Sequence, residues 1–584
     1  MKQMNQGKFD ICENKIIIRL SDRLCETEEE LLASKLFREI LQSAVDKLQK
    51  RNSYLLGIFG KKEITDKDID ALIETLKFLT KVSRQLVPNV VKDSQCFFQD
   101  PVLLNDFVEY VYNYWRSFDR FVISDSTGKD WDKRPYRTFT LTIGQLTNII
   151  RSVYRDIQEN ITGNHPRIYR QVTAGAEVST ISLEKKIPLP GGAYQKLKKI
   201  SVIRQILLYP PLILNPPMNK RTGKFERILQ NPLELFELKD DEWLCYPAKV
   251  GPLVILVYFH NRFAELGHAL CNLFQLAEDE DLNRKPDAVF AFGVPGDVLD
   301  GFGVFPTVFY EDEENGILVG AVPGRNEFGY FGYLKKMMLT LHNIIMMKRG
   351  RLPYHGAFVR LMLKGGKDKT ILFIGDTGAG KSETLEALRE IGETDIQDLI
   401  IIADDMGSLT IDNGQIVGYG TEIGAFLRLD DLQPGYALGQ IDRAIIMSAN
   451  QVNARIILPV TTFEHVIRGY KVDFVLYANN YEELDDDHPI MERFQTAEQA
   501  MSIFREGTVM SKGTTTSTGI VHSYFANVFG PPQYRDLHEQ LARKFFQQFF
   551  DSGIYVGQMR TRLGLAGWER KGPLEAAREL LKTI

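Results

Sequence analysis

A glycine-rich turn between a short apolar run and a helical segment constrains the fold of this 584-residue chain more than any other feature. Residues 370–374 are apolar and rich in strand-favouring side chains, and residues 383–391 have the composition of a helix. The turn between them follows the pattern G-x-x-x-x-G-K-[ST], with Gly375, Asp376, Thr377, Gly378, Ala379, Gly380, Lys381 and Ser382, and Glu383 comes next. A strand, a glycine loop and a helix in this order predict an α/β domain.

Such a turn directs several backbone N–H groups and a helix N-terminus towards one point, which suits a polyphosphate. Glycines allow backbone angles that other side chains forbid. We expect Lys381 to neutralise the β- and γ-phosphates of a nucleoside triphosphate and Ser382 to place its hydroxyl on Mg²⁺. The alternative is a glycine-rich turn with an accidental lysine, but the flanking strand and helix favour the phosphate site.

A second predicted strand, residues 398–403, ends in the pair Asp404 and Asp405. Carboxylates at the end of a strand beside the loop can supply the hard oxygen ligands that a nucleotide-bound metal needs. A solvated acidic turn is the alternative, and the neighbouring loop favours the metal. We therefore expect the pair Asp404 and Asp405 to supply oxygen ligands to the metal of the nucleotide site.

Composition and charge exclude several classes of protein. The net charge of −5 and the lack of a basic run give no reason to expect nucleic acid. No apolar run reaches the roughly 18 residues that a membrane span requires. The five cysteines are widely separated, which fits neither a disulfide framework nor a zinc site, and the N-terminus shows no secretory signal. We expect a cytoplasmic protein without membrane or nucleic-acid partners; its oligomeric state is not predicted.

The length predicts two or three domains. Residues 1–90 have helical periodicity and are expected to form a helical extension. The expected strands farther along are 250–258, 288–292, 316–321, 370–374, 399–403, 416–419, 443–448 and 472–477. The expected helices are 31–50, 66–87, 261–276, 333–348, 383–391 and 538–550.

From about residue 285 onward, six motifs in order resemble the phosphoenolpyruvate carboxykinases, most closely the ATP-using branch. Tyr330-Phe-Gly-Tyr-Leu-Lys335-Lys336-Met resembles the family's Y-G-G-E-M-K-K-G, and His355-Gly-Ala follows at the family's spacing. The glycine turn and Ala403-Asp404-Asp405 resemble G-L-S-G-T-G-K-T and G-D-D. Glu422-Ile-Gly-Ala-Phe-Leu-Arg428, Asn453-Ala-Arg455-Ile and Gly513-Thr-Thr-Thr…Phe529-Gly530 resemble the remaining three, the last of which is the lid.

The resemblance implies a two-domain architecture, with a substrate domain over residues 91–345 and a nucleotide-binding domain with the P-loop and lid over 346–584. It also implies that Lys336, His355 and Asp405 hold Mn²⁺. A lysine binds metal only when deprotonated, so burial and a nearby cation must lower its pKa. For His355 alone, a core histidine is the alternative, and its spacing to Lys336 favours the metal.

Three arginines complete the predicted site. The resemblance implies that Arg428 and Arg455 neutralise phosphate, with a planar fork suited to its oxygens. Arg221 lies in a basic turn and either binds the substrate carboxylate or is simply exposed.

The chain departs from the family pattern around the organic substrate. Thr516 stands where the lid has arginine, and Met406-Gly407 replaces Glu-His after Asp405. The glycine turn with Glu383 is also similar to that of HPr kinase/phosphorylase.

The resemblance implies that the enzyme decarboxylates and phosphorylates oxaloacetate with ATP. Two alternatives stay open: a kinase of the same fold acting on another small molecule or a protein serine, and a nucleotide-binding regulator without catalysis. The choice of ATP over GTP or pyrophosphate is also open.

Overall fold

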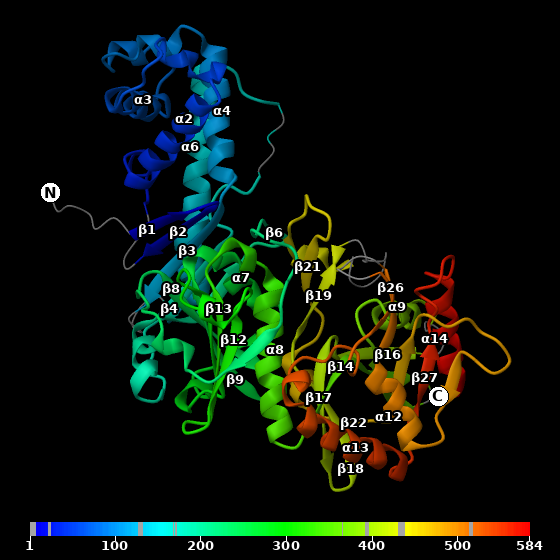
Figure 1. Cartoon of the computed structure of the whole chain (residues 1–584). Coiled ribbons are helices and arrows are strands. Elements are labelled where there is room, and N and C mark those ends of the chain that lie inside the picture. Colours follow the sequence, from blue (N-terminus) through cyan, green and yellow to red (C-terminus); the bar gives the residue numbers. More distant parts are fainter. Residues whose placement is uncertain are drawn as a thin grey trace. The chain divides into compact units, whose positions relative to one another are not determined.

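The computed structural model describes residues 8–20, 25–126, 132–167, 169, 172–364, 366–391, 396–429, 439–512 and 518–584. Over these residues the chain is a mixed α/β protein with several mixed sheets, which confirms the predicted fold class (Figure 1). It divides into two units, Met1–Glu184 with Ser201–Tyr209 and Lys185–Ile200 with Pro210–Ile584. The carboxykinase-like architecture and its domain limits stay predictions.

The first unit combines a helical layer with a five-strand array in the order β1-β2-β3-β4-β5. The strands are β1 Lys8–Cys12, β2 Lys15–Leu20, β3 Asp119–Ser126, β4 Val178–Leu183 and β5 Val202–Leu208. The helices are α1 Glu28–Leu32, α2 Lys35–Lys50, α3 Asp66–Leu79, α4 Pro101–Arg116, α5 Pro135–Phe139 and α6 Gln145–Thr162. Thus helices account for most of residues 28–79, as predicted.

The expectation that the first ninety residues are helical is wrong for residues 8–20, which form β1 and β2. β2 contains three consecutive isoleucines, whose branched side chains favour a strand, and all six of its residues are buried. Its parallel partner β3 begins at Asp119. Because the pairing joins segments a hundred residues apart, local periodicity does not reveal it.

In the second unit, one sheet has the strand order β8-β9-β11-β13-β12-β7, with β10 beside β8. Its strands are β7 Phe225–Ile228, β8 Trp243–Val250, β9 Leu253–His260, β10 Gln275–Leu276, β11 Ala288–Val294, β12 Thr307–Asp312 and β13 Ile317–Pro323. The helix α8, Phe331–Lys348, contacts strands of this sheet and β14 and β17 of the next one. It is buried on nearly every face, as expected of a helix between two sheets.

The second sheet of this unit has the order β22-β18-β17-β14-β15-β23-β27-β24, with β16 beside β14. Its strands are β14 Leu352–Leu363, β15 Asp368–Ile374, β16 Ile396–Ala403, β17 Met406–Asp412, β18 Gln415–Gly420, β22 Tyr470–Lys471, β23 Phe474–Asn479, β24 Met491–Arg493 and β27 Tyr555–Arg560. Its helices are α9 Lys381–Ile391, α11 Phe463–Ile467, α12 Ala497–Glu506, α13 Arg535–Asp551 and α14 Lys571–Thr583. Because β15, β23 and β27 are parallel, their carboxyl ends share the edge where the glycine turn begins.

Two smaller sheets complete the second unit. One has the order β19-β21-β20-β6, with β6 Leu212–Leu214, β19 Gly424–Arg428, β20 Ile445–Met447 and β21 Arg455–Pro459. The other pairs β25 Thr508–Lys512 with β26 Thr518–His522. Among the described residues, no helix is long and apolar enough to cross a membrane.

The predicted strands are confirmed with shifted ends, but the helix predicted over 261–276 is wrong for most of its length. Only α7, Ala264–Ala269, is α-helical, and 3₁₀ turns flank it. The carbonyl of Leu273 accepts the N–H of Ile423 at 2.9 Å, and Gln275–Leu276 pair with β8. Tertiary hydrogen bonds thus use the backbone groups that a longer helix requires. The helix predicted over 66–87 likewise ends early, at Leu79.

Candidate functional site

The glycine turn lies between β15 and α9, as the sequence predicts. Gly378 and Gly380 have φ angles of +80° and +97°, which favour glycine. A Cβ on Gly380 would lie 2.6 Å from Thr561 Oγ1, so this position is also closed to side chains by packing. The Thr561 hydroxyl donates to the Ala379 carbonyl at 2.8 Å, and the Asn480 amide donates to the Gly378 carbonyl at 2.9 Å. The two neighbouring strands β23 and β27 thus fix the shape of the turn.

Lys381 is buried at the start of α9, and its ammonium donates to the carbonyls of Gly375 and Asp376. Burial lowers the pKa of Lys381, although Asp405 and Asp376 oppose the shift. Ser382 follows on the first turn of the helix and is exposed. Its hydroxyl is therefore accessible to a ligand at this helix N-terminus.

His355 on β14 contacts Asp405, which lies in the bend between β16 and β17. The Gly356 N–H donates to the Asp405 carbonyl at 2.8 Å, which fixes the bend against β14. His355 Nε2 lies 2.9 Å from Asp405 Oδ1, and Nδ1 contacts the carbonyl of Ala526. A carbonyl only accepts, so Nδ1 is the donor to Ala526 and Nε2 is the nitrogen that faces Asp405. Nε2 is thus the nitrogen on the side of the carboxylate where a metal ion would bind.

Lys335 on α8 holds the other oxygen of Asp405. Its Nζ lies 2.6 Å from Asp405 Oδ2 and 3.6 Å from Glu422 Oε1, and its side chain is only 3% exposed. Burial opposes its charge, but the two carboxylates outweigh burial and raise the pKa of Lys335. Lys335 and His355 in turn outweigh burial at Asp405 and hold the pKa of Asp405 well below its usual value. Asp405 therefore remains ionised.

The pKa of Lys336, the next residue of α8, is shifted in the opposite direction. Burial and the charge of Arg221 lower the pKa of Lys336 to about 8, against the attraction of Asp405 and Asp376. Its Nζ lies 4.7 Å from the centre of the Phe529 ring. Burial and a nearby cation are the two influences that a lysine ligand requires, and both act here.

Arg221 is partly buried beside α8 rather than fully exposed. Its Nη1 donates to the Gly223 carbonyl at 2.6 Å, and its guanidinium lies 5.3 Å from the Phe225 ring centre. The backbone N–H of Thr222 donates to the Tyr333 hydroxyl at 2.9 Å, which fixes the turn against the helix. Burial lowers the pKa of Arg221. The structure thus brings Arg221 into the electrostatic neighbourhood of Lys336.

Two carboxyl groups beside Asp405 are buried and hold protons more tightly than usual. Burial, with the charge of Asp405, raises the pKa of Asp404 to about 6. Burial also raises the pKa of Glu422 to about 8, although Lys335 opposes the shift. Thr421 contacts the Glu422 carboxyl through its hydroxyl. The site therefore contains one ionised carboxylate, Asp405, and two that take up protons near neutral pH.

Arg428 and Arg455 are direct partners across the antiparallel strands β19 and β21. Their side chains therefore project from the same face of the sheet. The Arg455 guanidinium lies 5.5 Å from the Phe426 ring centre and interacts with Tyr330 at the start of α8. The charges of Lys335 and Arg221 also act on Tyr330, so Arg455 lies in the same electrostatic environment as Lys335.

These residues fit a divalent metal ion. His355 presents Nε2, Asp405 presents an ionised carboxylate, and Lys336 has a pKa low enough to become a neutral amine. The described part of the chain contains no group of three or more His, Cys, Asp or Glu side chains that could hold a metal. Lysine is not one of these residue types, so a site that includes Lys336 stays a prediction.

Sequence reasoning assigned no role to Ala526, whose carbonyl orients His355. Phe525, Ala526 and Asn527 have φ angles of 45°, 55° and 62°, a left-handed turn of three residues that side chains normally disfavour. The centres of the Phe525 and His538 rings lie 4.7 Å apart, and this packing helps to hold the turn. No local pattern signals this turn, because tertiary packing imposes it. Lys335 and Glu422 belong to motifs that resemble the carboxykinases, but the sequence predicted no role for them.

Residues 513–517 of the predicted lid, which include Gly513 and the departure Thr516, lie outside the described residues. The strands on both sides, β25 and β26, are paired. Ser523 follows β26, and its hydroxyl donates to Asp376 Oδ2 of the glycine turn at 3.2 Å. The hairpin base is thus attached directly to the turn.

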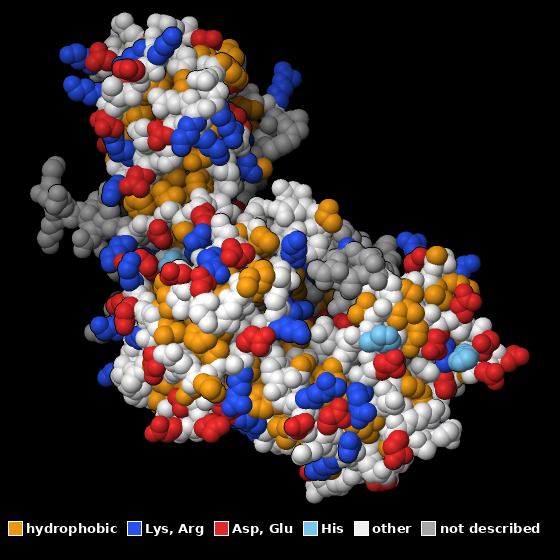
Figure 2. All heavy atoms as spheres, viewed as in Figure 1, with side chains coloured by type: hydrophobic (Ala, Val, Ile, Leu, Met, Phe, Trp, Pro, Cys, Tyr) orange, Lys and Arg blue, Asp and Glu red, His pale blue; other side chains and the backbone are white. Residues whose placement is uncertain are grey.

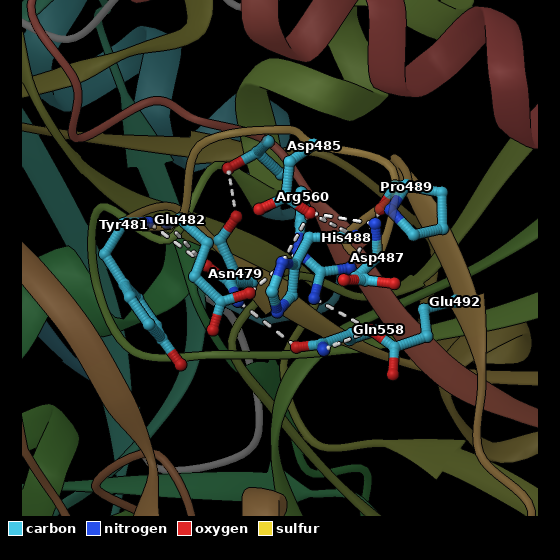
Figure 3. Close-up of polar contacts among 11 residues, drawn as sticks. Asn479, Tyr481, Glu482, Asp485, Asp487, His488, Pro489, Glu492, Gln558 and Arg560 are labelled. Atoms are coloured by element: carbon cyan, nitrogen blue, oxygen red, sulfur yellow. Dashed lines mark hydrogen bonds and ion pairs between the residues drawn. The ribbon is translucent and has the colours of Figure 1, made fainter.

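A buried ionic cluster supports the segment that carries Asn480. Arg560, which is 1% exposed, donates to Glu482 at 2.7 Å, to Glu492 at 2.8 Å and to the Pro489 carbonyl at 2.8 Å (Figure 3). Asn479 and Gln558 extend the same network. Arg560 thus holds both ends of a loop that begins beside the glycine turn.

Neither a family model nor a curated protein matches the chain.

Replacing Lys335 by methionine should destabilise the fold strongly. The change removes the buried ammonium from the ionised Asp405, at a cost of about 3–5 kcal/mol in the free energy of unfolding. Urea denaturation at neutral pH measures this loss. Lys348→Met, at the opposite end of the same helix and 38% exposed, is the matched control and should cost about 1 kcal/mol or less. Equal losses for both variants would contradict the role of Lys335.

Replacing Arg560 by methionine should loosen the segment beside the glycine turn. Two carboxylates lose their buried partner, so we expect faster amide hydrogen exchange over residues 479–492 and a stability loss of about 3 kcal/mol or more. Arg493→Met removes an exposed arginine on β24 and should leave exchange unchanged. Unchanged exchange in the Arg560 variant would show that the cluster does not hold the loop.

Proposed function

We propose that the chain is an ATP-dependent enzyme that decarboxylates and phosphorylates oxaloacetate to phosphoenolpyruvate, as the carboxykinases that it resembles do. The observation that carries the proposal is the environment of Asp405. This carboxylate contacts His355 and acts on Lys336, whose pKa is about 8, and on Lys381 in the glycine turn. A general phosphate loop needs no deprotonatable lysine beside a histidine and a carboxylate, whereas a site for this reaction does.

The glycine turn supports the nucleotide half of the proposal. The Lys381 ammonium donates to two neutral carbonyls, Gly375 and Asp376. Charged phosphate oxygens are stronger acceptors, so ATP can draw the ammonium away from these carbonyls. In this proposal Arg428 and Arg455, which project from one face of the strand pair β19 and β21, share the remaining negative charge.

In this proposal Lys336, His355 and Asp405 hold Mn²⁺, and Ser382 holds the Mg²⁺ of the nucleotide. When bound, the manganese ion supplies positive charge beside the oxygen on which negative charge develops. The protonation states of the protein side chains determine whether they can bind the ion. Asp405 stays ionised because of Lys335 and His355, and Lys336 loses its proton near pH 8.

The bond changes are balanced without another reactant. The bond from C3 of oxaloacetate to its C4 carboxylate breaks, CO₂ leaves, and the electron pair forms an enolate. The enolate oxygen attacks the γ-phosphorus, and ADP leaves with the electrons of the broken P–O bond. In this proposal Arg221, whose charge acts on Lys336, neutralises the remaining carboxylate of the substrate.

A kinase with the same nucleotide site and another acceptor is the second candidate. Met406, fully buried after Asp405, and Thr516 in the lid replace polar family residues near the organic substrate. These changes affect the acceptor more than the phosphate residues.

The proposal predicts that the protein forms phosphoenolpyruvate from oxaloacetate, ATP and Mn²⁺. Lys336→Met and His355→Ala should each lower kcat by about 100-fold or more, because each removes charge stabilisation at the reacting oxygen. A coupled assay of phosphoenolpyruvate measures the rate, and Lys348→Met is the control on the same helix. No product from the wild-type protein, with ATP consumed in the presence of another acceptor, would favour the second candidate.

Manganese affinity should depend on pH through Lys336. Below its pKa of about 8 a proton competes for the amine. The affinity for Mn²⁺ should therefore fall by up to about tenfold for each pH unit below that value. Electron paramagnetic resonance of free Mn²⁺ measures the affinity between pH 6.5 and 9. Lys336→Met should bind more weakly and lose the part of the slope due to this proton. An identical slope in the variant would exclude Lys336 as a ligand.

A further inference from the structure

The apolar core of the first unit is divided into two clusters of buried residues. One cluster joins helices α1, α2, α3, α4 and α6, with Phe107 and Ile157 among its members. The other lies between β2 and the helices and contains Ile18, Ile40, Leu146 and Ile150. A small unit normally builds one contiguous core, so the division calls for an explanation.

A cavity of about 330 Å³ lies where the two clusters meet. All six residues just named line it, so both clusters contribute to its wall. Protein interiors normally leave few voids larger than a water molecule. An apolar cavity of about 150 Å³ is enough to bind benzene, so this one has room for a larger hydrocarbon.

The polar atoms of two aromatic residues in the wall, Trp115 and Tyr154, already have protein partners. The Trp115 indole N–H donates to the Ala174 carbonyl at 2.6 Å. The Tyr154 hydroxyl contacts the Glu109 carboxylate, and its ring stacks on Tyr112 at 3.8 Å. The wall therefore offers hydrocarbon and aromatic faces to an occupant, and a polar ligand would lose its hydrogen bonds to water without replacement.

The cavity opens to solvent at the start of α2. The exposed residues Ala33 and Lys35 line it at this end, together with Glu30 and Ser34. Lys35 Nζ lies 3.5 Å from Glu39, so both charges are present at the mouth. Figure 2 shows hydrophobic side chains gathered on the surface of this unit among charged ones. An apolar interior with a charged mouth matches a molecule with one hydrocarbon chain and one polar end.

We propose that the cavity between the two core clusters of the first unit binds a single-chain amphiphile, such as a medium-chain fatty acid or alcohol. The chain lies against Ile18, Ile150 and Ile157, and the polar end stays at the mouth near Lys35. The volume suits one chain rather than the two chains of a membrane phospholipid. This function is separate from the proposed catalysis, whose residues all belong to the second unit.

Calorimetric titration of the full-length protein with 1-octanol, 1-decanol and decanoate, below micelle formation, tests the proposal. Burial of each methylene should raise the affinity about fourfold until the cavity is filled. Tighter binding of decanoate than of decanol, lost in Lys35→Met, would place a carboxylate beside the lysine. Equal binding of both would place a neutral head group there. Absence of saturable binding by all three would overturn the proposal.

Matched variants on α6 separate ligand binding from general packing. Ile150→Trp fills the cavity, so it should weaken decanol binding by about tenfold or more while leaving the melting temperature near that of the wild type. Ile161→Trp, a fully buried position on the same helix outside the cavity wall, should overpack the core and lower the melting temperature. Undiminished decanol binding by a folded Ile150 variant would overturn the site. If this variant does not fold, the chain-length series in the wild type decides.

Discussion

The contacts of Asp405 with Lys335 and His355 are the interactions on which the candidate site depends. One carboxylate oxygen lies 2.6 Å from the lysine ammonium and the other 2.9 Å from the imidazole. Lys335 comes from the helix between the two large sheets, His355 from the strand next to the glycine turn, and Asp405 from the bend that follows β16. The carboxylate thus joins three elements from distant parts of the sequence at one point, and it acts electrostatically on Lys381 of the glycine turn.

Two adjacent lysines of α8 have opposite pKa shifts because successive side chains of a helix point about 100° apart. Lys335 faces two carboxylates and keeps its charge, whereas Lys336 faces Arg221 and has a pKa of about 8. The first lysine stabilises the buried acid cluster, and the second becomes available as a neutral donor. This division of roles follows from the positions of the charges around the helix and not from the lysine pair itself.

The sequence predicted local features well and tertiary ones poorly. The order of strand, glycine turn and helix around Lys381 was correct because it depends on local composition. The left-handed turn at Ala526, which orients His355, was missed because packing imposes it. The segment that forms β2 was predicted to be helical, because its partner β3 is distant in the chain. The helix expected over 261–276 is short because its backbone groups form hydrogen bonds with other segments.

A crystal structure with Mn²⁺ and a non-hydrolysable ATP analogue, measured at the manganese absorption edge, tests the central claim most directly. The account predicts an anomalous peak in contact with Lys336 Nζ, His355 Nε2 and the Asp405 carboxylate, next to phosphates bound by residues 375–382. A manganese peak that none of these three side chains contacts, or a polyphosphate bound away from the glycine turn, would contradict it.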